Sequence, residues 1–261
     1  MNDSPARPGP EVREFDDAAA LVAAAADDLV AVIEQAQAER GFASIVLTGG
    51  TNGNALSAAL REKVIDWSRV DVFFGDERFV AGDDADRNAL QAQNALLDHV
   101  PVPSERVYTF PAADEFSGDG DLAARVYAKR LADNATERGN GVAVGSAGGA
   151  LVPRFDVHLL GMGGEGHINS LFPHTDAARE QDATVVSVRD SPKPPPRRLT
   201  LTLPAVGAAR RVWFLVSGAD KAEAVAEGVG GASPEDWPCA GAHGSEHTVW
   251  YVDGAAASRL G

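Results

Sequence analysis

The chain has 261 residues, and its 38 acidic and 23 basic side chains give a net charge of −15. Nucleic acids and anionic membranes select clusters of Lys and Arg, so this charge argues against both as partners. It does not argue against a small anionic substrate held by a few cations. Hydrophobic residues make up 44% of the chain, as in ordinary globular proteins, and the length allows one large domain or two small ones.

The N-terminal segment has no apolar stretch of the kind found in signal peptides. No run approaches the ~18–20 apolar residues of a membrane helix. The single cysteine, Cys239, agrees with a reducing compartment. We therefore expect a cytoplasmic protein with a disordered tail over residues 1–12 and one domain over 13–261, acting as a monomer or a weak homodimer.

Hydrophobic periodicity predicts strands alternating with helices along the chain. In order, we expect a helix over 17–40, a strand over 43–47, a helix over 54–62, a strand over 70–74, a helix over 88–97, a strand over 106–110, a helix over 120–138, strands over 155–160, 184–188, 198–202 and 212–216, a helix over 220–228 and a strand over 248–252. This alternation predicts an α/β protein with a mostly parallel sheet and helices on both faces. Ligands of such sheets bind beyond the carboxyl ends of the strands.

Residues 139–150 interrupt this pattern with Gly, Ala and Ser. We interpret them as a flexible surface loop. A domain linker is the alternative, but strand–helix alternation resumes on both sides.

The first polar strand end is the loop Thr48, Gly49, Gly50, Thr51, between a predicted strand and a predicted helix. Its glycines allow backbone N–H groups to approach an anion, and the helix N-terminus adds partial positive charge. The loop matches neither G-x-G-x-x-G nor a Walker A motif, which disfavours dinucleotide or ATP binding. A tight turn with no ligand is an equally good interpretation.

The second strand end carries Asp76, Glu77 and Arg78. These residues could place a carboxylate and a cation in a cleft, although such triplets more often form solvated turns or local ion pairs.

The third strand end holds four glycines between Gly161 and Gly166, followed by His167. An imidazole can act as a general base near neutral pH, and Glu165 lies two residues before it. We favour a functional role over a structural one for this histidine.

A fourth segment, 191–200, brings Lys193, Arg197 and Arg198 together in an acidic protein. Its prolines lower the entropy lost when these side chains bind an anion; a basic surface loop is the alternative. His243 and His247 flank Glu246 but do not form the H-E-x-x-H zinc motif. We therefore expect no metal and no cofactor.

Residues 48–51, 75–80, 86–88, 161–167 with the Ser-Leu-Phe-Pro run at 170–173, and 192–200 occur in an order that resembles the 6-phosphogluconolactonases. The segments 212–225 and 249–252 are also similar, so the resemblance extends from about residue 11 to the C-terminus. The Gly-His pair followed by Ser-Leu-Phe-Pro is its most specific motif.

The resemblance implies a Rossmann-like sheet shared with glucosamine-6-phosphate deaminase. It also implies hydrolysis of 6-phospho-D-glucono-1,5-lactone to 6-phospho-D-gluconate, the second step of the oxidative pentose phosphate pathway, without metal or cofactor. By resemblance, His167 is the base that activates water. Arg78, Lys193 and Arg198 hold the phosphate and polar substrate groups, and the loop 48–51 lines the same pocket.

The residues fit this reaction. Hydrolysis of a lactone needs a water nucleophile, a base, and donors for the developing oxyanion. Either Asp76 or Glu165 could orient His167. The oxyanion donors could be backbone N–H groups of a glycine-rich turn, or Arg78. Gly163 is a candidate substrate- or phosphate-binding residue.

Two other functions remain open. One is a glucosamine-6-phosphate deaminase or isomerase-like enzyme, although its Gly-His motif continues toward Phe-Asn-Glu-Pro and it carries Asp-Glu-Tyr where this chain has Asp76, Glu77 and Arg78. The other is a non-catalytic sugar-phosphate-binding protein.

Overall fold

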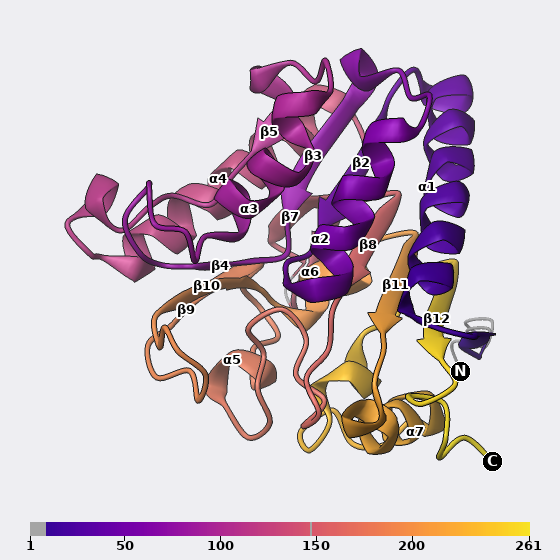
Figure 1. Ribbon diagram of the computed structural model, residues 1–261. Coiled ribbons are helices and arrows are strands. Elements are labelled where there is room, and N and C mark those ends of the chain that lie inside the picture. The colour runs from indigo at the N-terminus through magenta and orange to yellow at the C-terminus, as the bar shows by residue number, and fades with distance from the viewer. Residues whose placement is uncertain (1–8, 147) are drawn as a thin grey trace, which may run out of the picture.

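Seven parallel strands form the central sheet of the protein, in the order β1-β12-β11-β8-β2-β3-β5 (Figure 1). The computed structural model describes residues 9–146 and 148–261. The strands are β1 (Glu11–Phe15), β2 (Ala43–Leu47), β3 (Val70–Phe74), β4 (Asp76–Arg78), β5 (Val107–Tyr108), β6 (Gly141–Val144), β7 (Ala150–Pro153), β8 (Val157–Leu160), β9 (Val185–Val188), β10 (Arg198–Leu201), β11 (Arg211–Val216) and β12 (His247–Asp253). The helices are α1 (Ala18–Arg40), α2 (Gly50–Ala59), α3 (Asn88–Ala95), α4 (Gly120–Arg138), α5 (Asp176–Arg179), α6 (Leu203–Gly207) and α7 (Ala222–Gly230).

The predicted α/β class is confirmed, and the apolar runs explain it. Every residue of β2 and β3 is buried, as expected for strands covered on both faces. Helices α1 and α2 pack against each other, and α1 contacts β2, β11 and β12 (Figure 1). Asp17 caps α1 by accepting the Ala20 N–H, and Gly41 ends it in the left-handed conformation. No helix in the described part of the chain has the length and hydropathy to cross a membrane.

Two predicted strands leave the central sheet. β9 and β10 pair antiparallel with each other, and β10 also pairs antiparallel with β4. This small sheet is what positions the basic segment, because its register places Arg198 opposite Arg78.

Two expectations are corrected. Residues 11 and 12 are not part of a disordered tail, because they belong to β1, which pairs in parallel with β12; residues 1–8 lie outside the described residues. Residues 139–150 are not a loop throughout: β6 and β7 form an antiparallel hairpin that packs on α4. The apolar side chains of Val142, Leu151 and Val152 support this pairing despite the neighbouring glycines.

Candidate active site

A cavity of about 150 Å³ opens at the carboxyl ends of the central strands. We call it the strand-end cavity. It brings together most of the predicted site residues and four that were not singled out; its lining is Thr48, Gly49, Gly50, Asp76, Arg78, Asn88, Gly161, Met162, His167, Asn169 and Arg198. The loops after β2, β3 and β8 thus converge as the parallel sheet requires.

His167 is held from one side by Glu165. Its Nδ1 lies 3.0 Å from Oε1 of Glu165, and its ring stacks on Phe172 with the centroids 4.4 Å apart. When Nδ1–H donates to the carboxylate, the other ring nitrogen, Nε2, carries the free lone pair. The structure therefore selects Glu165 over Asp76 as the carboxylate that contacts His167.

Lys193 shares the same carboxylate. Its Nζ lies 2.9 Å from Oε1 and 3.1 Å from Oε2 of Glu165, and 3.4 Å from Nδ1 of His167. Hydrogen bonds from His167 and then Lys193 hold the pKa of Glu165 well below its usual range. Glu165 is thus an anion at working pH. Lys193 does not line the strand-end cavity and lies beside the base.

Asp76 is part of the cavity wall, and other groups occupy both of its oxygens. Oδ2 accepts the Ser170 hydroxyl at 2.6 Å, and Oδ1 accepts Nδ2 of Asn88 at 3.0 Å. The side chain is buried, and Nη1 of Arg198 is 4.0 Å away. Asp76 therefore joins the loop after β8 to α3.

Glu77 is fully buried on the other side of β4. It accepts the backbone N–H groups of Arg78, Asn88 and Ala89, and Nε of Arg87 lies 3.5 Å from Oε2. These bonds satisfy the free N–H groups at the start of α3. Burial raises the pKa of Glu77 despite these partners.

The two arginines of the cavity differ in their free donors. Arg198 is buried and donates Nε and Nη2 to the carbonyls of Lys193, Pro194 and Pro195. Burial also lowers its pKa. Arg78 donates Nη1 to Asn88 and to the Asp86 carbonyl, which leaves Nη2 without a recorded partner among the described residues. Arg78 is the better placed of the two to bind a ligand.

Gly163 lies in the turn that carries His167. Its N–H donates to the His167 carbonyl at 3.1 Å, so it closes the turn. A Cβ at this position would overlap the His167 ring and the Glu165 carboxylate. Position 163 therefore requires a glycine, because any side chain would displace His167 and Glu165.

The loop after β2 lines a second, adjoining cavity of about 240 Å³, which we call the Lys221 cavity. It shares Gly49, Gly50, Gly161 and Met162 with the strand-end cavity, and Thr51 and Lys221 lie on its wall. Thr48 Oγ1 accepts the Gly161 N–H at 3.1 Å, which joins the loop after β2 to the loop after β8.

Helix α2 begins at this cavity without a capping side chain on Gly49, so its first N–H groups can bind an anion. The sequence analysis missed Lys221. The only signal was its place just after β11, on the same edge of the sheet.

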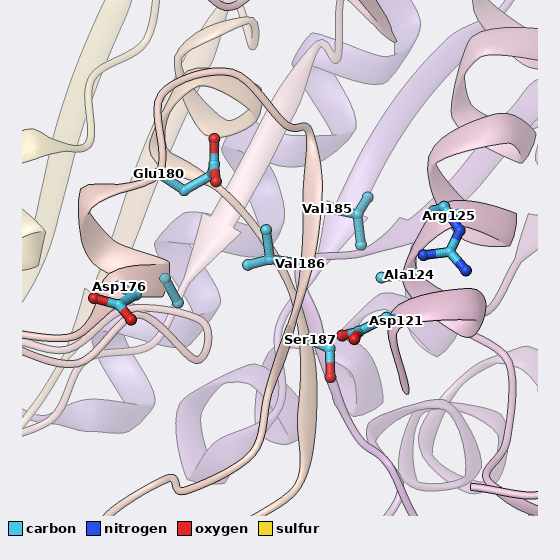
Figure 2. A pocket seen from close by; sticks show the side chains of 9 residues that line it. Asp121, Ala124, Arg125, Asp176, Glu180, Val185, Val186 and Ser187 are labelled. Atoms are coloured by element: carbon cyan, nitrogen blue, oxygen red, sulfur yellow. The ribbon is translucent and has the colours of Figure 1, made fainter. Parts of the chain in front are cut away.

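A further cavity in the described part of the chain lacks this combination of groups. This cavity of about 330 Å³ lies between α4, α5 and β9, with Asp176 and Glu180 on one side and Asp121 and Arg125 on the other (Figure 2). It contains none of the predicted site residues. Within residues 9–146 and 148–261, no group of His, Cys, Asp and Glu side chains is placed to hold a metal ion.

Comparison with known proteins identifies the family. The model of the family described as glucosamine-6-phosphate isomerases/6-phosphogluconolactonase matches residues 16–250. The 6-phosphogluconolactonase of Mycobacterium tuberculosis is 53% identical over 249 residues, which cover 94% of this chain and 96% of that protein.

Solved structures show the same fold. A 6-phosphogluconolactonase from Trypanosoma cruzi matches with a TM-score of 0.82 and 25% identity, over 98% of this chain and 99% of that one. A monomeric glucosamine-6-phosphate deaminase shares the fold, with a TM-score of 0.72 and 23% identity over 95% and 99% of the two chains. The chain belongs to the glucosamine-6-phosphate isomerase/6-phosphogluconolactonase family.

Proposed function

We propose that the protein hydrolyses 6-phospho-D-glucono-1,5-lactone to 6-phospho-D-gluconate, the second step of the oxidative pentose phosphate pathway, with His167 as the general base. The observation that carries this proposal is the contact between His167 Nδ1 and Glu165 at the strand-end cavity. The 53% identity to a 6-phosphogluconolactonase supports the choice of substrate.

The reaction follows from these positions. Nε2 of His167 takes a proton from water as the water oxygen bonds to C1 of the lactone, and Glu165 stabilises the imidazolium that forms. The tetrahedral intermediate then expels the ring oxygen, which takes the proton back from His167. The lactone is already activated, so no covalent nucleophile is needed, and we expect direct attack by water.

Oxygen labelling tests this last step. In a single turnover in H₂¹⁸O, direct attack places the label in the product carboxylate. A product without label would identify an acyl-enzyme formed by a protein carboxylate in place of direct hydration.

The substrate phosphate is best accommodated in the Lys221 cavity. There the uncapped start of α2 and the Lys221 side chain line one cavity, and both favour an anion. The Lys221 ammonium also lies 2.9 Å from Asp220 Oδ2. Arg78 then remains for the sugar hydroxyls near C1. Phosphate binding at a distance from C1 supplies the energy that orients the lactone.

The deciding experiment is lactone hydrolysis. The lactone is generated in place, its spontaneous decay is subtracted, and the wild type is compared with His167→Ala. Removal of a general base lowers kcat by ~10²–10⁴-fold. A wild-type rate equal to spontaneous decay would refute the proposal, and ammonia release from glucosamine 6-phosphate would then test the deaminase alternative.

The same variant tests a purely binding function. A sugar-phosphate-binding protein would bind 6-phosphogluconate but show no turnover that depends on His167. We further propose a cytoplasmic protein that acts as a monomer or weak homodimer without metal or cofactor. The lone, buried Cys239 supports the cytoplasmic location. Sedimentation would test the assembly, and lactone hydrolysis with and without a chelator would test metal dependence.

A further inference from the structure

Asn169 combines a place on the strand-end cavity with an unusual backbone. It lies two residues after His167 and has a left-handed φ of 47°. Of the described non-glycine residues, only Ser117 and His174 also have a positive φ, and neither lines this cavity. Backbone strain of this kind persists where surrounding structure imposes it, and it concentrates at functional sites.

The surroundings impose it here. Ile168 forms bridges with Met162 and Leu171, and the Ser170 N–H donates to Thr200 Oγ1. The backbone on both sides of Asn169 is therefore fixed.

His158, on β8, lies behind the Asn169 side chain. It is fully buried, and burial lowers its pKa to about 3, so the imidazole is neutral whenever the protein is folded near neutral pH. Nδ2 of Asn169 lies 3.4 Å from its Nε2. In the tautomer that has the ring proton on Nδ1, an atom that itself has no hydrogen-bond partner, Nε2 accepts one N–H of the amide and orients it.

The rest of the amide is unused. Asn169 Oδ1 is buried without a hydrogen-bond partner, and no second partner of Nδ2 exists among the described residues. A Cβ at Gly75 would overlap Oδ1, so the chain after β3 leaves room for this amide. A buried polar atom without a partner destabilises the folded protein.

Of the other donors around the cavity, Arg78 keeps a free Nη2, which the proposed function assigns to the sugar hydroxyls. The Gly163 N–H closes its own turn, and Arg198 donates Nε and Nη2 to loop carbonyls. Asp76 can only accept. A donor that is held in place and is not otherwise bonded can stabilise a developing oxyanion.

We propose that Asn169 is a catalytic residue whose free amide N–H donates to the lactone carbonyl oxygen, and that His158 is the positioning residue for that amide. The inference rests on the proposed lactonase function. As the water oxygen bonds to C1 and its proton passes to His167, the C=O electron pair moves onto the carbonyl oxygen, which Asn169 then stabilises. The electron pair on the oxyanion re-forms the C=O bond when the ring oxygen leaves.

Asn169→Gly tests the donor, because glycine accepts the positive φ while removing the amide. Loss of one oxyanion donor lowers kcat by ~10²-fold or more, and we expect KM to change little. The pH profile of kcat/KM should keep its wild-type shape, since His167 and Glu165 stay in place. The matched control is His174→Gly, which removes a positive-φ side chain outside the cavity and should retain wild-type kcat.

The positioning role is tested by His158→Gln and His158→Leu. Glutamine can supply an acceptor for the amide and leucine cannot, so kcat should be higher in the glutamine variant at equal fraction folded. Equal kcat in these two variants would overturn the role of His158. If the wild-type protein hydrolyses the lactone and Asn169→Gly retains a near-wild-type kcat, the inference is overturned but the proposed function is not. If the wild-type protein does not hydrolyse the lactone, both are overturned.

Discussion

Two strand ends on the same edge of the sheet carry acidic side chains in different surroundings. After β3, Asp76 and Glu77 are buried, and every carboxylate oxygen accepts a hydrogen bond from Ser170, Asn88 or nearby backbone. After β8, the Glu165 side chain is 38% exposed, and its recorded side-chain partners are His167 and Lys193.

The difference in surroundings indicates a structural role for the carboxylates after β3 and a catalytic role for the carboxylate after β8. A buried carboxylate whose oxygens are bonded to fixed groups cannot change partner without a large cost. A half-exposed carboxylate such as Glu165, bonded to His167 and Lys193, can stay hydrogen-bonded to the imidazole when that imidazole gains or loses a proton. Asp76 and Glu77 therefore stabilise the wall of the strand-end cavity, whereas Glu165 orients the general base His167.

Glu77→Ala should give the largest effect, on stability. It leaves Arg87 buried without its carboxylate and frees the N–H groups at the start of α3, which should lower the free energy of unfolding by about 3–5 kcal/mol. Urea denaturation measures this loss, with exposed Glu62→Ala as the control. A loss below 1 kcal/mol, on the scale of an exposed pair, would mean that Glu77 does not hold the wall.

Asp76→Asn should lower stability while largely sparing turnover. The amide cannot accept from both Ser170 and Asn88 as the carboxylate does, and a broken buried hydrogen bond costs ~1–3 kcal/mol. We expect kcat to stay within a few-fold of wild type at equal fraction folded. If kcat instead fell as far as in Glu165→Gln, Asp76 would share the orientation of His167.

Much of the fold could be predicted because local pattern and burial agree. The predicted strands at 43–47 and 70–74 match β2 and β3 to the residue, and the helix at 120–138 matches α4. The hairpin at residues 141–153 was missed because its glycines signal a loop while its pairing depends on packing against α4. β1 was missed because its partner, β12, lies at the other end of the chain.

The site was predicted as far as chain order allows. The rule that ligands bind beyond the carboxyl ends of parallel strands predicted Thr48, Asp76, Arg78 and His167 from the sequence, and all four line the strand-end cavity. It could not choose between Asp76 and Glu165, because that choice depends on which oxygens Ser170 and Asn88 occupy. Asn169 was not predicted for a similar reason. Its proposed role depends on the contact with His158, and the sequence pattern identifies His158 only as a strand residue.

Glu165→Gln should lower kcat with little loss of stability. Glutamine keeps the shape but removes the charge that stabilises the imidazolium, so we expect a decrease of ~10–100-fold, less than the ~10²–10⁴-fold of the base itself. Initial rates at saturating lactone measure it, with exposed Glu62→Gln as the control. An unchanged kcat would contradict the assignment of Glu165 as the partner of His167.

The smallest effect is a difference in the sign of pH dependence between the two strand ends. The folded pKa of Glu165 lies below its unfolded value, so its stabilisation is present above about pH 4.3 and is lost as the pH falls below it. The folded pKa of Glu77 is raised by burial, so its titration favours folding at low pH, and that contribution is lost as the pH rises through the raised pKa.

Urea denaturation of wild type, Glu165→Gln and Glu77→Gln at about pH 4 and pH 7 separates these contributions. From pH 4 to pH 7, the stability difference between wild type and Glu165→Gln should grow, by less than about 1 kcal/mol because the site is half exposed. The difference between wild type and Glu77→Gln should shrink over the same interval. The same sign for both variants would mean that the two carboxylates do not differ in the way their surroundings require.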